Sequence, residues 1–185
     1  MKKTLLCCTA LSIALSCFCQ ATQKGTELGI GFDAGLPTGN FKNMSNFGIG
    51  GTATFAYHFN RLWAISFQTG YVVFAGRHIS FADSTGNNAT YKLPNLNTMP
   101  LKMGARCNLG KGFYAEPQAG FALLSKKGSD GIKRFTSFTY AASVGYAWRR
   151  GVNVSLRYER LTAYGGLSFI GVRITYNFFT SELGY

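Results

Sequence analysis

Apolar and polar residues alternate with a period of two along most of the chain after about residue 25, and no segment shows the period of an amphipathic helix. In residues 168–179, for example, Ile170, Val172 and Ile174 share one face, while Arg173 and Thr175 lie on the other. Each stretch is near or above the roughly 9–11 residues that a tilted strand needs to cross a bilayer. The eight predicted strands are 27–36, 47–59, 63–75, 98–109, 113–124, 135–148, 152–161 and 168–179.

The connections between these strands alternate in length. Tight turns at 60–62, 110–112 and 149–151 alternate with longer connections at 37–46, 76–97, 125–134 and 162–167. Short turns at one rim and longer loops at the other are typical of a transmembrane barrel, with both termini at the short-turn rim. The longest connection, 76–97, is rich in Asn, Ser, Thr and Gly, so we expect a mobile, exposed loop.

Alternation alone also fits a soluble lipocalin-like barrel, whose polar faces would meet water. Those faces carry few charges here, whereas a soluble surface is roughly 25–35% charged. They carry instead Gly29, Gly31, Gly35, Gly48, Gly50, Gly70, Gly104, Gly120, Gly145 and Gly171. Glycine suits the narrow interior of an eight-stranded barrel. The predicted fold class is therefore all-β, an eight-stranded antiparallel up-and-down transmembrane β-barrel.

The polar faces also carry four acids and four bases. Because buried charges must be paired, this balance predicts a charge network inside a packed polar lumen. Its predicted members are Glu27, Asp33, Lys102, Arg106, Glu116, Arg157, Glu159 and Arg173. The alternative is a set of exposed strand charges that match by chance.

Aromatic residues gather at the strand ends beside the tight turns. They are Phe59, Trp63, Phe113, Trp148, Tyr176 and Phe178. Rings with an apolar body, and a polar tip in Trp and Tyr, belong at a membrane interface. The pattern favours a barrel that crosses a membrane.

Composition is consistent with one barrel domain and excludes some functions. Of 185 residues only 14% are charged, against about 25% in ordinary soluble domains. The 19 Lys and Arg residues are mostly scattered singly, so nucleic-acid binding is not expected. Residues 1–21 read as a secretory signal peptide, cleaved after Cys19 or Ala21, and 22–185 as the barrel domain. A single membrane anchor and a lipoprotein signal are the alternatives.

Cysteine and histidine are too scarce for disulfide, metal or cofactor chemistry. Removal of the signal would leave Cys107 alone, without a disulfide framework. Two histidines and one cysteine do not build a transition-metal site, and His58 is expected in the polar core. We therefore expect no cofactor and no metal site.

Catalysis has one weak candidate, His78 with Ser80 two residues away and Asp83 as a possible third member. This would make the protein an outer-membrane lipid hydrolase, but a polar loop start is the simpler explanation of the pair. Residues 157–167 resemble the corresponding segment of outer-membrane lipid A deacylases, but those enzymes carry a His-x-Ser pair where this chain has Arg160 and Thr162. Without the imidazole there is no general base to activate a hydroxyl. We predict no catalytic residues and no enzymatic activity.

The alternation, the segment "MPLKMGARCNLGKGFYAEPQAGFALL" and the C-terminal "IGVRITYNFF" resemble the small outer-membrane β-barrel proteins of the OmpA/OmpX and porin-like kind, especially those of Bacteroidetes. The resemblance covers about residues 25–179. It implies a Gram-negative outer-membrane location and a last strand that the barrel-assembly machinery reads. The matching positions are Gly171, Ile174, Tyr176 and Phe178.

The leading hypothesis is a monomer with a structural or surface-interaction role, and the alternative is a small passive channel. The long loops carry cations that would meet lipopolysaccharide phosphates beside the outer-membrane lipid, although charged loops can simply be solvated. These cations are Lys42, Arg77, Lys92, Lys126, Lys127, Lys133 and Arg134.

Overall fold

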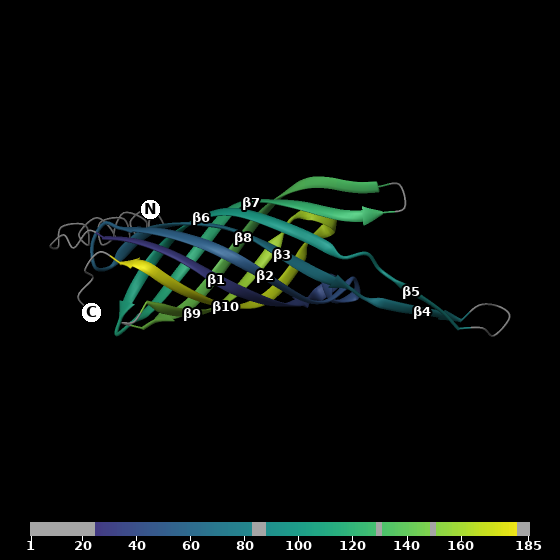
Figure 1. Ribbon diagram of the computed structural model, residues 1–185, viewed down its shortest axis with the longest axis horizontal. Helices are drawn as coiled ribbons and strands as arrows, with labels where there is room; N and C mark the ends of the chain where they lie inside the picture. Colours follow the sequence, from purple (N-terminus) through teal and green to yellow (C-terminus); the bar gives the residue numbers. More distant parts are fainter. Residues whose placement is uncertain (1–24, 83–87, 129–130, 149–150, 181–185) are drawn as a thin grey trace, which may run out of the picture.

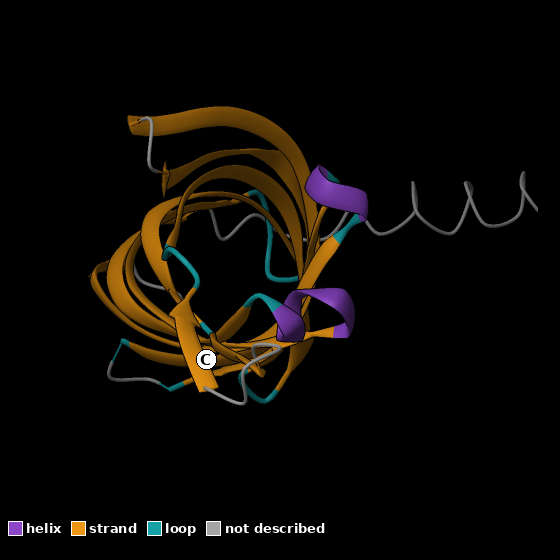
Figure 2. Ribbon diagram, turned by 90° about the vertical axis from the view of Figure 1, so that its right-hand side faces the viewer, coloured by secondary structure: helices purple, strands orange, loops and turns teal. Residues whose placement is uncertain are grey.

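The computed structural model describes residues 25–82, 88–128, 131–148 and 151–180. Its strands form one closed antiparallel barrel in the order β1-β10-β9-β8-β7-β6-β3-β2 (Figures 1 and 2). The expected signal peptide, residues 1–21, lies outside the described residues. The predicted fold class is confirmed.

Each predicted strand has a counterpart in the barrel, usually longer than predicted. The barrel strands are β1 (Gly25–Thr38), β2 (Ser45–His58), β3 (Trp63–Gly76), β6 (Leu96–Gly110), β7 (Phe113–Gly128), β8 (Gly131–Ala147), β9 (Val152–Leu161) and β10 (Leu167–Thr180). Two short 3-10 helices, η2 (Gly39–Asn43) and η3 (Ala163–Gly165), follow β1 and β9. Among the described residues, no helix is long and apolar enough to cross a membrane.

The barrel is closed by its first and last strands, with Asp33 opposite Arg173 and Gly35 opposite Gly171. Glu27 pairs with Thr180, so the two ends of the barrel sequence meet at the rim that carries the tight turns. Figure 1 shows this rim opposite the end from which the long hairpins project.

The tight turn between β6 and β7 has an unusual backbone. Gly110, Lys111 and Gly112 have φ values of 90°, 53° and 86°. Glycine adopts this left-handed region without steric cost, so one glycine on each side of Lys111 allows the chain to reverse direction.

The connection 76–97 differs from the irregular loop expected from its composition. It contains a second antiparallel pair, β4 (His78–Ala82) and β5 (Asn88–Lys92), which extends away from the barrel (Figure 1). The expected loop 125–134 is likewise largely strand, because β7 and β8 continue pairing to Gly128 and Gly131. The pairing of β8 with β9 begins at Thr139, so residues 131–138 of β8 extend beyond the end of β9. Polar composition concealed this pairing because an exposed hairpin buries neither face and needs no apolar alternation.

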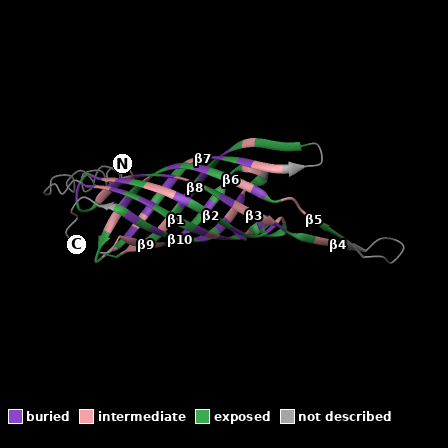
Figure 3. Ribbon diagram, viewed as in Figure 1, coloured by how far each residue is buried: buried purple, intermediate pink, exposed green. Residues whose placement is uncertain are grey.

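Burial alternates along the strands where they form the closed barrel, whereas residues 131–134 of β8 are all exposed (Figure 3). In β10, Ile170, Val172, Ile174, Tyr176 and Phe178 are 43–53% exposed, whereas Arg173 and Thr175 between them are buried. The aromatic residues predicted at the tight-turn rim are also exposed or half-buried. The apolar face therefore points outward and the polar face inward.

Candidate functional site

The lumen is the candidate site, and the structure places all eight predicted lumen charges there, none more than 7% exposed. Every salt bridge between described residues involves this set or His58. The charges form two groups along the barrel axis.

The first group, here called the Arg106 cluster, comprises Glu27, His58, Arg106 and Glu116. Arg106 Nη1 donates to Glu27 Oε2 at 3.0 Å, and its Nε donates to Glu116 Oε2 at 2.9 Å. His58 Nε2 lies 3.1 Å from Glu27 Oε1. One guanidinium therefore joins two carboxylates from β1 and β7.

Neutral partners complete this cluster. Asn177 donates to Glu27 at 3.1 Å, and both Ser66 and Gln118 donate to Glu116. The Arg106 guanidinium also lies 4.4 Å from the centre of the Tyr114 ring, a cation–π contact. The two carboxylates thus accept hydrogen bonds from amides and a hydroxyl as well as from Arg106.

The second group, here called the Arg157 cluster, comprises Asp33, Lys102, Arg157, Glu159 and Arg173. Arg173 Nε donates to Asp33 Oδ1 at 2.9 Å, and Lys102 Nζ donates to Glu159. Arg157 lies between the two carboxylates, 3.4 Å from Asp33 and 3.4 Å from Glu159. Thr139 donates to Glu159 at 3.0 Å.

The formal charges of the two clusters differ. With neutral His58, the Arg106 cluster has two acids and one base, and the Arg157 cluster has two acids and three bases. Together the eight charges cancel. Electrostatic balance is therefore a property of the whole lumen rather than of either cluster.

An enclosed cavity of about 10 Å³ borders both clusters, with Arg106, Glu116 and Arg173 in its lining. Its wall includes Gln68, which is 2% exposed and has no hydrogen-bond partner for either amide atom, and Arg173 Nη2 is also without a partner. A water molecule needs about 10–15 Å³ and two to four polar partners, so the space fits about one water.

An apolar cluster that the sequence analysis did not predict occupies the lumen toward the long-loop rim. It consists of Phe41, Val72, Phe74, Leu96, Ala122, Leu124, Leu161, Leu167 and Phe169 and is here called the apolar plug. Phe74 is at its centre, with ring centroids 4.8 Å from Phe41 and 5.0 Å from Phe169. Phe41 comes from η2, outside the barrel strands.

Two glycines open space for the rings inside the barrel. A Cβ atom at Gly48 would lie 2.5 Å from the Phe74 ring, and one at Gly145 would lie 2.4 Å from the Tyr114 ring. In both cases the glycine is the direct cross-strand partner of the aromatic residue. At these two positions each ring lies over a glycine in the neighbouring strand, so the missing side chain leaves room for the ring.

The remaining sequence candidates stand apart from the lumen. Ser80 Oγ contacts Thr90 Oγ1 at 3.3 Å across the β4–β5 hairpin, and His78 is the cross-strand partner of Lys92. Asp83 lies outside the described residues. Among the described residues, no group of three His, Cys, Asp or Glu side chains could hold a metal ion.

The barrel, its inward charges and its outward apolar face are matched by a family model described as "Outer membrane protein beta-barrel domain", over residues 9–185. The chain belongs to this family. It is therefore an integral β-barrel protein of the outer membrane of a Gram-negative bacterium. Among curated proteins, no match is found.

Solved barrels of the same fold include Ail, the attachment invasion locus protein of Yersinia pestis. Ail in complex with the heparin analogue sucrose octasulfate is 13% identical with a TM-score of 0.57, covering 85% of this chain and all of Ail. The structure of Ail without this ligand is 12% identical with a TM-score of 0.58, and it has the same coverage. The backbone structure of Ail in a phospholipid bilayer nanodisc is 14% identical with a TM-score of 0.52, covering 84% of this chain and all of Ail. These likenesses show the shared barrel fold.

Proposed function

We propose that this outer-membrane protein is a closed, monomeric, non-enzymatic barrel that displays cationic hairpins for interaction at the cell surface. The observation that carries the proposal is the lumen, which contains two ion-paired clusters and, beyond them, the apolar plug. The cavity that borders both clusters fits about one water. An ion would have to break buried salt bridges and then cross an apolar layer.

Single-channel recording in planar bilayers tests the closed lumen. The folded protein should give no conductance steps above leak, and reproducible steps would favour the passive channel instead. Phe74→Ala serves as a comparison, because removal of one ring from the plug leaves both charge clusters in place. This variant should also remain silent.

The hairpins beyond the barrel support the surface-interaction role. Lys133 and Arg134 are exposed on β8, and Lys126 and Lys133 are direct cross-strand partners. Like charges opposite each other are unfavourable unless an anion lies nearby. Within the described residues, no carboxylate forms a salt bridge with either side chain. Phosphate groups of lipopolysaccharide outside the bilayer are the anions we propose.

A soluble polyanion tests this role without any lipid. Sucrose octasulfate, the ligand named in the Ail complex, is a suitable probe for calorimetry. Lys133→Gln/Arg134→Gln should weaken its binding, and raised salt should weaken binding to the unchanged protein. Lys111→Gln, an exposed cation of the opposite rim, is the matched control. Equal binding by all three proteins would contradict the role of these hairpins.

We further propose that the barrel-assembly machinery reads the last strand. Gly171 is buried, whereas Ile174, Tyr176 and Phe178 lie on the lipid-facing side, 50–53% exposed. Phe178→Ala should reduce the fraction of protein assembled in the outer membrane, measured by the gel shift between unboiled and boiled samples. The same variant should refold normally in detergent, since that step needs no machinery.

We also propose that the chain consists of a signal peptide, residues 1–21, and a barrel domain, residues 22–185. N-terminal sequencing of protein purified from outer membranes tests this boundary. A mature chain that still carried residues 1–21 would contradict it.

A further inference from the structure

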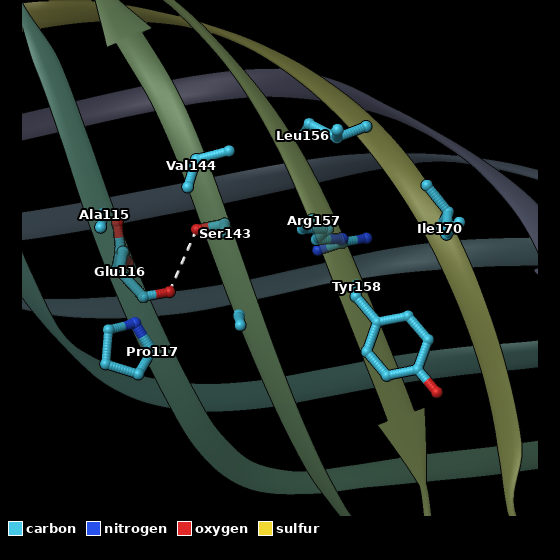
Figure 4. Close-up of a pocket in the computed structure, with 10 residues that line it drawn as sticks. Ala115, Glu116, Pro117, Ser143, Val144, Leu156, Arg157, Tyr158 and Ile170 are labelled. Carbon is cyan, nitrogen blue, oxygen red and sulfur yellow. Dashed lines mark hydrogen bonds between the residues drawn. The ribbon is translucent and has the colours of Figure 1, made fainter.

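A groove of about 420 Å³ lies on the lipid-facing side of β7, β8, β9 and β10 (Figure 4). Small outward residues on β7 and β8, namely Ala115, Pro117 and Ala142, contribute to its lining, and larger side chains come from β9 and β10. Elsewhere the outward positions are often occupied by large side chains such as Leu101 or Phe121, which are 66% and 60% exposed. The groove is a depression among bulkier outward side chains.

One end of the groove lies toward the rim of the long loops. Tyr158 and Pro117 lie on either side of β8 at the end toward which β9 runs, and Leu156 and Val144 lie toward the other end (Figure 4). Tyr158 pairs with Ala142 on one side and Ile170 on the other. Its phenol places a hydroxyl group at the outer end of an apolar surface, as is typical near a membrane interface.

Arg160 lies two residues beyond Tyr158 on the same face of β9 and is exposed. Its direct cross-strand partner is Tyr140, whose ring is 43% exposed. A Cβ atom at Gly166 would lie only 2.8 Å from Arg160 Nη2, so the guanidinium rests against the loop after η3. Arg160 forms no salt bridge with any described carboxylate.

We propose that this surface is a site for a single lipid A molecule, with one acyl chain in the groove and a phosphate group on Arg160. The shape and the charge favour this combination, because the groove is apolar and Arg160, just beyond its outer end, carries a guanidinium that matches phosphate geometry. Tyr158 lines the groove, and Tyr140 is the direct cross-strand partner of Arg160. The outer rim places the charge in the leaflet that contains lipid A. This inference depends neither on the closed lumen nor on the cationic hairpins.

Native mass spectrometry of the barrel in detergent, titrated with purified lipid A, tests the site. The unchanged protein should retain one lipid A molecule. Arg160→Gln should weaken retention about tenfold, which corresponds to about 1.4 kcal/mol. Ala142→Leu, which fills the groove with an exposed side chain, should weaken it by a similar factor. The gel shift on boiling shows that each variant is folded.

Matched controls separate this site from general lipid contact. Ala105→Leu makes the same change at another exposed alanine, on β6, and Lys111→Gln removes an exposed cation at the opposite rim. Both should retain lipid A like the unchanged protein. Phosphatidylglycerol, in place of lipid A, should be retained less well. The site is overturned if all variants retain lipid A equally, if the controls lose it equally, or if phosphatidylglycerol binds as well.

Discussion

The charged clusters and the apolar plug fill the same lumen by different physical means. Arg106 and its partners depend on directed contacts at 2.9–3.1 Å, so each partner has one useful position. Phe41, Phe74 and Phe169 depend on non-directional packing, with centroids about 5 Å apart. A polar interior fixes which strands face each other, whereas an apolar one mainly requires a filled volume.

The contrast also explains where each layer lies. Most of the charges come from the middle and the tight-turn half of the strands, and Glu159 lies nearer the long-loop end of β9. The plug lies toward the rim where η2 inserts Phe41 from outside the barrel. A side chain from a connecting segment can take part in non-directional packing. It is less suited to a contact in which one guanidinium must meet two carboxylates at fixed positions.

The largest effect is expected from Arg106→Met. It leaves Glu27 and Glu116 buried without their shared cation, and breaking a buried pair costs about 3–5 kcal/mol. Denaturant titration of the refolded barrel, followed by gel mobility, measures the loss. Lys102→Met is the comparison, because Glu159 keeps Arg157 and Thr139 as partners and the loss should be smaller.

A triple variant sharpens the same point. Glu27→Gln/Arg106→Met/Glu116→Gln removes the cation and both charges together, so no buried ion is left without a partner. Its free energy of unfolding should recover much of what Arg106→Met alone loses. A triple variant as unstable as the single one would show that packing around Arg106, rather than charge, stabilises this layer.

Phe74→Ala tests the plug. Removal of the central ring leaves a cavity beside Phe41 and Phe169 and should cost about 3 kcal/mol in the same titration. Phe74→Leu keeps most of the volume and should cost less than about 1.5 kcal/mol. Equal losses in the two variants would indicate that ring geometry, not filled volume, determines the stability of the plug.

Gly145→Ala should have an intermediate effect. The added methyl group would lie 2.4 Å from the Tyr114 ring, which in turn contacts Arg106, so overpacking should cost about 1–3 kcal/mol. Tyr114→Phe serves as a comparison that keeps the ring in place. Truncation of the ring in Gly145→Ala/Tyr114→Ala should relieve part of the strain, and an additive loss would exclude a direct clash.

The smallest effect is expected outside the lumen. Lys133→Gln should change the free energy of unfolding by no more than about 0.5 kcal/mol, because the side chain is exposed and makes no described salt bridge. The same denaturant titration measures this. A large loss would mean that the hairpin helps to stabilise the barrel.

Sequence alternation predicted the barrel strands and the inward position of Glu27, Asp33 and their partners, because one side-chain period assigns every residue to a face. The particular pairs could not be predicted. Arg157 contacts acids from two strands, Asp33 on β1 and Glu159 on β9, and this depends on the stagger of the closed barrel.

The plug has a signal in the sequence that strand alternation does not reveal. Runs such as Val72-Val73-Phe74 and Leu123-Leu124 break the period, because both faces of the strand are apolar near the long-loop rim. The role of Phe41 had no such signal, since it lies in a connection rather than in a strand.

The seam between β1 and β10 sets the order in which the fold can be completed. Its contacts join residues 140 and 150 positions apart, as in Arg173 with Asp33 and Asn177 with Glu27. Until that pairing forms, two edge strands expose backbone donors and acceptors that lipid cannot satisfy. We therefore expect closure of this seam to be the slow, long-range step of folding.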